Sequence, residues 1–160
     1  MSIPLDNMYR EVILDHYHAP RGRKPLERAN VTSDGTNPSC GDEITLNAQV
    51  ENDVLKDVHV DCKGCAISVA SGSMLAESVK GRPLDEVRKI ARLVRKMLKG
   101  EDDADLPEEL EDLESLKGIR QFPVRVKCAL LAWVTLMEGL ENYQSRTQGE
   151  KTVVSTEEDD

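Results

Sequence analysis

The sequence is organised around one short polar stretch, Asn37-Pro38-Ser39-Cys40-Gly41-Asp42. It places a thiol and a carboxylate two residues apart in a turn, because proline fixes its own φ and Gly41 allows a sharp bend. Residues 43–50 follow with apolar side chains at alternate positions, which predicts a strand that anchors the turn. Two polar side chains held together in this way suit a metal ion or a reactive sulfur. The alternative is a hairpin that carries a cysteine by chance.

Composition limits the classes of protein to which the chain can belong. Its 160 residues predict one domain with one core, and because only 3% of them are aromatic that core must be aliphatic. A net charge of −9 argues against nucleic acid as a partner. We find no apolar run long enough for a membrane span and no signal-peptide pattern, so we expect a cytoplasmic protein and no membrane partner. The four cysteines would stay reduced there, which indicates a metal or catalysis rather than disulfides.

The pattern of apolar residues predicts an α+β fold with a small antiparallel sheet of about three strands, packed on one side by helices. Strands are predicted at residues 31–36, 43–50 and around 58–62. Helices are predicted at residues 6–18, 66–79 and 84–99, and from Pro123 onward. In the last helix, the side chains expected on the buried face are Val124, Leu131, Val134 and Leu140.

Two segments are expected to lie outside the core. Residues 101–114 hold nine acidic side chains and no basic one, which predicts an exposed insertion with a short helix near residues 108–116. Residues 143–160 are polar and acidic, which predicts a disordered tail and a domain that spans residues 1–142.

The other three cysteines lie at or near the ends of predicted elements. Cys65 stands where a strand turns into a helix, and the free N–H groups and the dipole of a helix N-terminus favour a thiolate. Cys128 falls one turn into the last helix, between the cations Arg125 and Lys127, although an inert buried cysteine fits there as well. Cys62 forms a C-x-x-C pair with Cys65, but the sequence holds no second such pair.

Four side chains make a candidate ligand set: Cys40, Asp42, Cys65 and Cys128. If the element ends that carry them converge, the set is suited to tetrahedral Zn²⁺ or to an iron–sulfur cluster. The spacing of these residues along the chain does not show whether they converge.

Three motifs, in this order, resemble the IscU/NifU N-terminal superfamily, and within it the SufU branch: Asn37-Pro38-Ser39-Cys40-Gly41-Asp42, Gly64-Cys65-Ala66-Ile67-Ser68 and Pro123-Val124-Arg125-Val126-Lys127-Cys128-Ala129. Residues 8–17 also look like SufU, so the resemblance covers about residues 6–142. It implies a SufE/NifU-like fold. Two features favour the SufU branch: Lys127 stands where IscU-type scaffolds have histidine, and an acidic insertion precedes Pro123.

The resemblance implies that Cys40, Asp42, Cys65 and Cys128 bind zinc. It also implies that Cys40 accepts sulfur from the persulfide of a SufS-type cysteine desulfurase, for downstream components of iron–sulfur cluster assembly. Such a chain acts as a sulfurtransferase partner rather than as a stand-alone enzyme. Cys62 lies outside the motifs and is interpreted as strand packing.

The residues themselves suggest how such a step would run. The loop cysteine Cys40 is the most mobile of the thiols and the natural nucleophile. Arg125 either stabilises the charge of the released thiolate or of Asp42, or forms a surface ion pair, and the sequence leaves these roles open.

Three hypotheses remain at this point. The chain is a zinc-bound sulfur acceptor that activates a desulfurase, a scaffold on which an Fe–S cluster is assembled and transferred, or a structural zinc module for protein binding.

Overall fold

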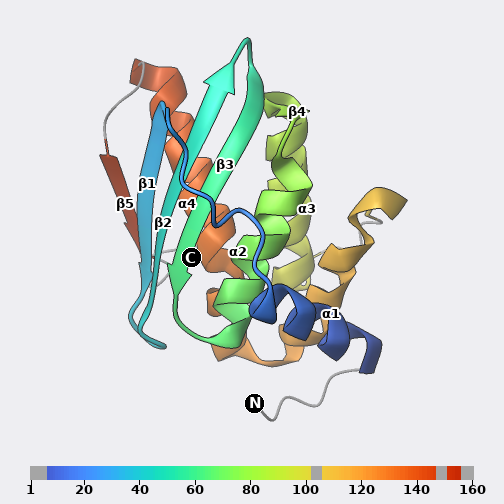
Figure 1. Cartoon of the computed structure of the whole chain (residues 1–160). Helices are drawn as coiled ribbons and strands as arrows, with labels where there is room; N and C mark the ends of the chain where they lie inside the picture. The colour runs from blue at the N-terminus through green and yellow to red at the C-terminus, as the bar shows by residue number, and fades with distance from the viewer. Residues whose placement is uncertain (1–6, 102–105, 147–150, 156–160) are drawn as a thin grey trace.

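The computed structural model describes residues 7–101, 106–146 and 151–155 and shows the α+β fold expected from the sequence (Figure 1). In chain order the elements are α1 (Asn7–His18), β1 (Val31–Asn37), β2 (Asp42–Glu51), β3 (Val54–Lys63), α2 (Ala66–Val79), β4 (Arg82–Pro83), α3 (Leu84–Lys99), the 3₁₀ helix η1 (Glu108–Gln121), α4 (Pro123–Arg146) and β5 (Lys151–Ser155).

The sheet has the order β4-β3-β2-β1-β5, so the three predicted strands form its centre and two short strands extend its edges. The central strands are antiparallel, whereas β5 runs parallel to β1. Asn52 and Asp53 have φ values of 52° and 60°, and together they form the two-residue turn that joins β2 to β3. At the other end of β2, Asn37 pairs with Asp42, which closes the loop of residues 38–41.

One face of the sheet is covered by α2 and α4 (Figure 1). The helix α2 is buried almost throughout, because its small side chains allow close approach on both sides. On one side, a Cβ placed at Gly72 would lie 3.0 Å from a methyl carbon of Val60 in β3. On the other side, Ser71 Oγ donates a hydrogen bond of 2.6 Å to the carbonyl of Ala129 and accepts one of 3.1 Å from Trp133 Nε1. The position of α2 is therefore tightly determined.

The two remaining long helices test the predicted apolar faces. The helix α3 has the predicted bounds and buries one stripe of apolar side chains: Leu84, Val87, Ile90, Ala91, Val94, Met97 and Leu98. In α4, Leu131 and Leu140 are buried as expected, but Val134 is only half-buried and Val124 is 56% exposed. The prediction for Val124 was wrong because the first turn of α4 lines a surface hollow instead of packing on the core.

The acidic segment and the C-terminal segment also differ from expectation. η1 is longer than the predicted short helix and buries Leu110, Leu113 and Leu116, so only part of the segment is an exposed insertion; residues 102–105 lie outside the described part. The structure differs from the predicted disordered tail at residues 143–146, which continue α4, and at β5, which pairs with the edge of β1. An open strand edge offers backbone groups that a passing segment can bind.

A buried histidine ties the N-terminal helix to the rest of the fold. His16 is fully buried; its Nδ1 lies 2.7 Å from Ser73 Oγ in α2, and its Nε2 lies 3.0 Å from Asp112 Oδ2 in η1. Glu77 Oε1 lies 3.8 Å from the same Nε2. The sequence analysis did not identify this role, because the partners are 57 and 96 residues away along the chain.

Replacing His16 by alanine is expected to lower the free energy of unfolding by about 3 kcal/mol, because it opens a cavity and leaves the Ser73 hydroxyl without this buried partner. Urea-induced unfolding measures the loss. The exposed neighbour His18 offers a matched control, since His18→Ala should change the free energy of unfolding by less than about 0.5 kcal/mol. Equal effects of the two substitutions would show that His16 does not join these helices.

Candidate metal centre

Three segments far apart in the sequence meet at one end of the sheet. They are the β1–β2 loop, the junction of β3 with α2, and the first two turns of α4 (Figure 1). Each of them carries one cysteine: Cys40, Cys65 and Cys128 respectively. The structure thus brings together the side chains whose convergence the sequence left undecided.

The donor atoms of Cys40, Asp42 and Cys128 all lie within 4.8 Å of one another. The Cys128 thiol is 3.2 Å from Cys40 Sγ and donates a hydrogen bond to it. Cys65 adjoins this set, with its Sγ 3.9 Å from Asp42 Oδ2. Three thiols and a carboxylate repel one another in their anionic forms, and a divalent cation removes that repulsion. The donor set therefore fits Zn²⁺ or an iron–sulfur cluster.

Asp42 is only 1% exposed, and both of its carboxylate oxygens accept hydrogen bonds that hold it in place. Its Oδ1 accepts a hydrogen bond of 2.8 Å from the backbone N–H of Cys65, and its Oδ2 accepts one of 3.3 Å from Asn37 Nδ2. The close approach depends on Gly64, because a Cβ there would overlap Asp42 Oδ1 and lie 2.7 Å from Asp42 Cγ. Gly41 supports the turn with a φ of 73°.

The thiol of Cys65 has a lower pKa than the thiols of Cys62 and Cys128. A hydrogen bond with Cys128 lowers the pKa of Cys65 to about 6 against the opposing effect of burial, and the backbone N–H groups of Ser68 and Ile67 lower it further. Cys65 is the N-cap of α2, the position at which the sequence predicted a favoured thiolate. The same hydrogen bond to Cys65 raises the pKa of Cys128, which keeps its proton.

In the zinc-free protein, alkylation of Cys65 is expected to rise as the pH passes upward through about 6, because the thiolate is the reactive form. Burial raises the pKa of Cys62 to about 11, so Cys62 should stay unmodified over this range. Mass spectrometry of peptides after timed alkylation at each pH measures both rates. A Cys65 rate that rises only above about pH 8, as for an ordinary thiol, would contradict the expectation.

Cys40 lies at the rim of an open hollow of about 630 Å³ on the protein surface. The residues that line the hollow are Ser39, Cys40, Cys65, Gln121, Phe122, Pro123, Val124 and Arg125. Arg125 Nη1 is 3.9 Å from Cys40 Sγ. Partial burial disfavours the charge of Arg125, but its hydrogen bond to Cys128 and the nearby Cys65 outweigh burial and raise its pKa. A cation therefore stands beside one of the two cysteines that line the hollow.

The remaining cysteine is separate from the site. Cys62 is buried in the core, and its Sγ lies 3.4 Å from Ser68 Oγ. It packs on the buried face of β3, as the sequence analysis interpreted it.

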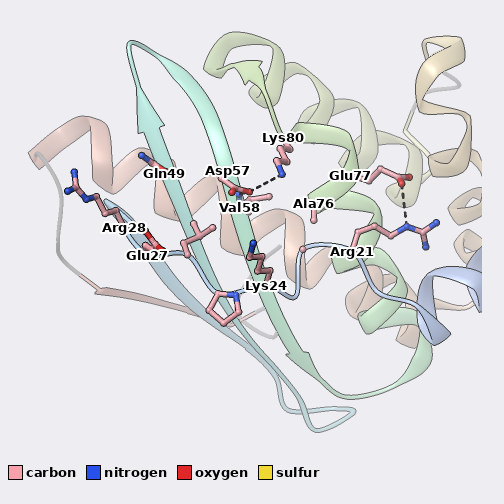
Figure 2. A pocket seen from close by; sticks show the side chains of 13 residues that line it. Arg21, Lys24, Glu27, Arg28, Gln49, Asp57, Val58, Ala76, Glu77 and Lys80 are labelled. Atoms are coloured by element: carbon pink, nitrogen blue, oxygen red, sulfur yellow. Dashed lines mark hydrogen bonds and ion pairs between the residues drawn. The ribbon is translucent and has the colours of Figure 1, made fainter.

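A larger cleft of about 820 Å³ lies between the segment after α1, β3 and the end of α2 (Figure 2). Its charges are mixed, since Arg21 pairs with Glu77 at 3.3 Å and Lys80 pairs with Asp57 at 3.5 Å. None of its lining residues is a cysteine. The cleft therefore has neither a thiol nor a strong excess of one charge.

Sequence reasoning missed three features of the site: the amide of Asn37, the need for glycine at position 64, and the exposure of Val124. Asn37 and Gly64 lie close to the motif cysteines in sequence, but their partners follow only from the packing. Among the described residues, no helix is both long and apolar enough to cross a membrane.

Comparison with known proteins agrees with this architecture. The chain is 38% identical over 136 residues to the zinc-dependent sulfurtransferase SufU of Bacillus subtilis, covering 85% of this chain and 91% of that protein. It is 40% identical over 134 residues to the iron-sulfur cluster assembly scaffold protein IscU of Thermotoga maritima, covering 84% and 93%. The crystal structure of FiSufU from Fervidobacterium islandicum AW-1 matches with a TM-score of 0.73 and 31% identity, covering 81% and 94%. The model of the NifU-like N-terminal domain matches residues 8–150. The chain therefore belongs to the NifU-like N-terminal domain family.

Proposed function

We propose that this chain is a cytoplasmic, zinc-dependent sulfur acceptor for iron–sulfur cluster assembly, and that its donor is a SufS-type cysteine desulfurase. The observation that carries the proposal is the position of Cys40 in a set of three thiols and one carboxylate, at the rim of an open hollow and beside Arg125. The similarity to a protein called a zinc-dependent sulfurtransferase supports it.

Cys40, Asp42, Cys65 and Cys128 would hold the zinc ion. Bound Zn²⁺ keeps thiols deprotonated and exchanges no electrons with sulfur, so it does not oxidise them. The protein contributes a site assembled before the donor arrives, since Asp42 is already hydrogen-bonded to the backbone of Cys65.

The sulfur-transfer step is a thiol exchange carried out by Cys40. Its thiolate attacks the terminal sulfur of the donor persulfide, a new S–S bond forms at Cys40, and the S–S bond of the donor breaks. The electron pair of the broken bond leaves with the donor cysteine as a thiolate, and the transferred sulfur keeps its proton. Arg125 stabilises the negative charge on Cys40 before the attack, because its guanidinium lies 3.9 Å from the sulfur.

The experiment that tests the proposal combines metal analysis with detection of the transferred sulfur. The purified protein should hold about one zinc per chain and be colourless. After incubation with the desulfurase and cysteine, mass spectrometry should find one added sulfur on the peptide that contains Cys40. Iron with labile sulfide and transfer of a cluster to an apo-acceptor would favour the scaffold hypothesis instead. Zinc without any sulfur on Cys40 would favour the structural module.

A further inference from the structure

The side chain of Asn37 has a polar environment that the proposed function does not use. It is fully buried at the end of β1, directly before the loop that carries Cys40. Its Nδ2 lies 3.4 Å from Cys128 Sγ and 3.3 Å from Asp42 Oδ2, so its two hydrogens serve two different members of the ligand set. One amide thus joins a donor from α4 to a donor from β2.

The carbonyl oxygen of the same amide is buried and has no hydrogen-bond partner among the residues that the structure describes. A buried acceptor without a partner destabilises a fold, and most native proteins avoid one. Turning the amide over would not help, because the carbonyl would then face the carboxylate of Asp42 and the sulfur of Cys128. The orientation is therefore determined by the ligand set and is unfavourable for the fold alone.

The hydrogen bonds divide the four proposed ligands into held and movable members. Asp42 and Cys128 are held by Asn37, and Asp42 is also tied to the backbone of Cys65. The backbone N–H of Cys40 donates a hydrogen bond of 3.2 Å to the carbonyl of Asn37, but the Cys40 sulfur, within the described structure, has its hydrogen-bond contacts with the Cys128 thiol and Arg125 rather than with the Asn37 amide. Sulfur acceptance requires one ligand to leave while the others stay in place.

We propose that Asn37 is a positioning residue of the metal site: its amide donates to the Cys128 sulfur and the Asp42 carboxylate and keeps both in place when Cys40 is released. This inference rests on the proposed function for the identity of the metal. Hydrogen-bonding partners of metal ligands orient them and typically contribute about 10- to 100-fold in metal affinity.

The test compares zinc affinity and stability in two variants of Asn37 and one control variant. Asn37→Val and Asn37→Ala remove the amide at the site. Asn30→Val is the matched control, because Asn30 precedes the same strand and makes two hydrogen bonds of 2.8 Å with the backbone of Val50. Zinc affinity is measured by competition with a chromogenic chelator, and thermal unfolding is measured on the zinc-free proteins.

The two positions should respond in opposite ways. Asn37→Val should weaken zinc binding about 10- to 100-fold with little change in the zinc-free midpoint, whereas Asn30→Val should lower the midpoint and leave zinc affinity unchanged. In the cobalt-substituted protein, the thiolate-to-cobalt absorption should shift in the Asn37 variants only, since one sulfur has lost an N–H donor.

Zinc affinity within twofold of the wild type in both Asn37 variants would overturn the inference, as would an equal loss of affinity in Asn30→Val. Failure of the proposed function gives a different result. If the proposed function is wrong, the wild-type chain and the Asn30 control would themselves fail to bind zinc, or would bind it without accepting sulfur.

Discussion

Replacing Cys40 by alanine is expected to abolish the stimulation of the desulfurase and the appearance of sulfur on this chain. The variant lacks the thiol that we propose as the nucleophile toward the donor persulfide. Cys128 is fully buried, and Cys65, which also lines the hollow, lies at the N-terminus of α2 rather than in a loop. The measurement is sulfide production from cysteine by the desulfurase with and without the chain. We expect at least a 100-fold lower stimulated rate.

Cys62→Ala is the matched control, because it removes a thiol that packs in the core beside Ser68 and lies outside the group of Cys40, Asp42 and Cys128. It should lower stability modestly and leave desulfurase stimulation intact. Circular dichroism should show that Cys40→Ala remains folded, since Cys40 lies in a loop and is only half-buried. Full stimulation by Cys40→Ala would exclude the sulfur-acceptor function, and unfolding of this variant would point to a structural zinc module.

Replacing Gly64 by alanine is expected to weaken zinc binding by 100-fold or more, although the change adds a single methyl group. The new Cβ would overlap Asp42 Oδ1 and lie 2.7 Å from Asp42 Cγ and 2.9 Å from Asp42 Cβ, so the carboxylate must move. Its movement also breaks the hydrogen bond from the Cys65 backbone. A displaced ligand and a lost charge-assisted hydrogen bond together cost about 3 kcal/mol or more, which corresponds to this loss in affinity.

Two comparisons isolate the effect on Asp42. Gly100→Ala places alanine at a left-handed C-cap with open space around it, so it should cost about 1 kcal/mol of stability without any change in zinc affinity. In an Asp42→Ala background, Gly64→Ala should cause no further loss, because the residue with which it clashes is gone. An additional loss in that background would mean that Gly64 acts through the backbone rather than through Asp42.

The local features of the site could be predicted from the sequence because each depends on a few neighbouring residues. Gly41 adopts the positive φ that the turn needs, and Cys65 caps the helix that follows Gly64. The bounds of α3 agree with the prediction because Pro83 marks the start of a regular apolar stripe and Gly100 marks its end. Signals of this kind act within one or two turns of chain.

The features that the sequence did not predict depend on packing between segments that are far apart in the chain. Val124 fits the apolar period of α4, but its exposure depends on where the first turn of that helix lies relative to the core. The hydrogen-bond partners of His16 could not be predicted because they belong to α2 and η1. Lys151–Ser155 was predicted to be disordered from its polar surroundings, yet the open edge of β1 pairs with it.

The sequence by itself determined the three central strands, the helices α1 to α4, the turn around Cys40 and the four candidate ligands, since each follows from residue type and short-range spacing. The tertiary structure alone decided that these ligands meet, that Asn37 joins two of them and that Gly64 must lack a side chain. The physical reason is distance along the chain. Cys40 and Cys128 are 88 residues apart, so their contact depends on how the β1–β2 loop and α4 pack on a common core.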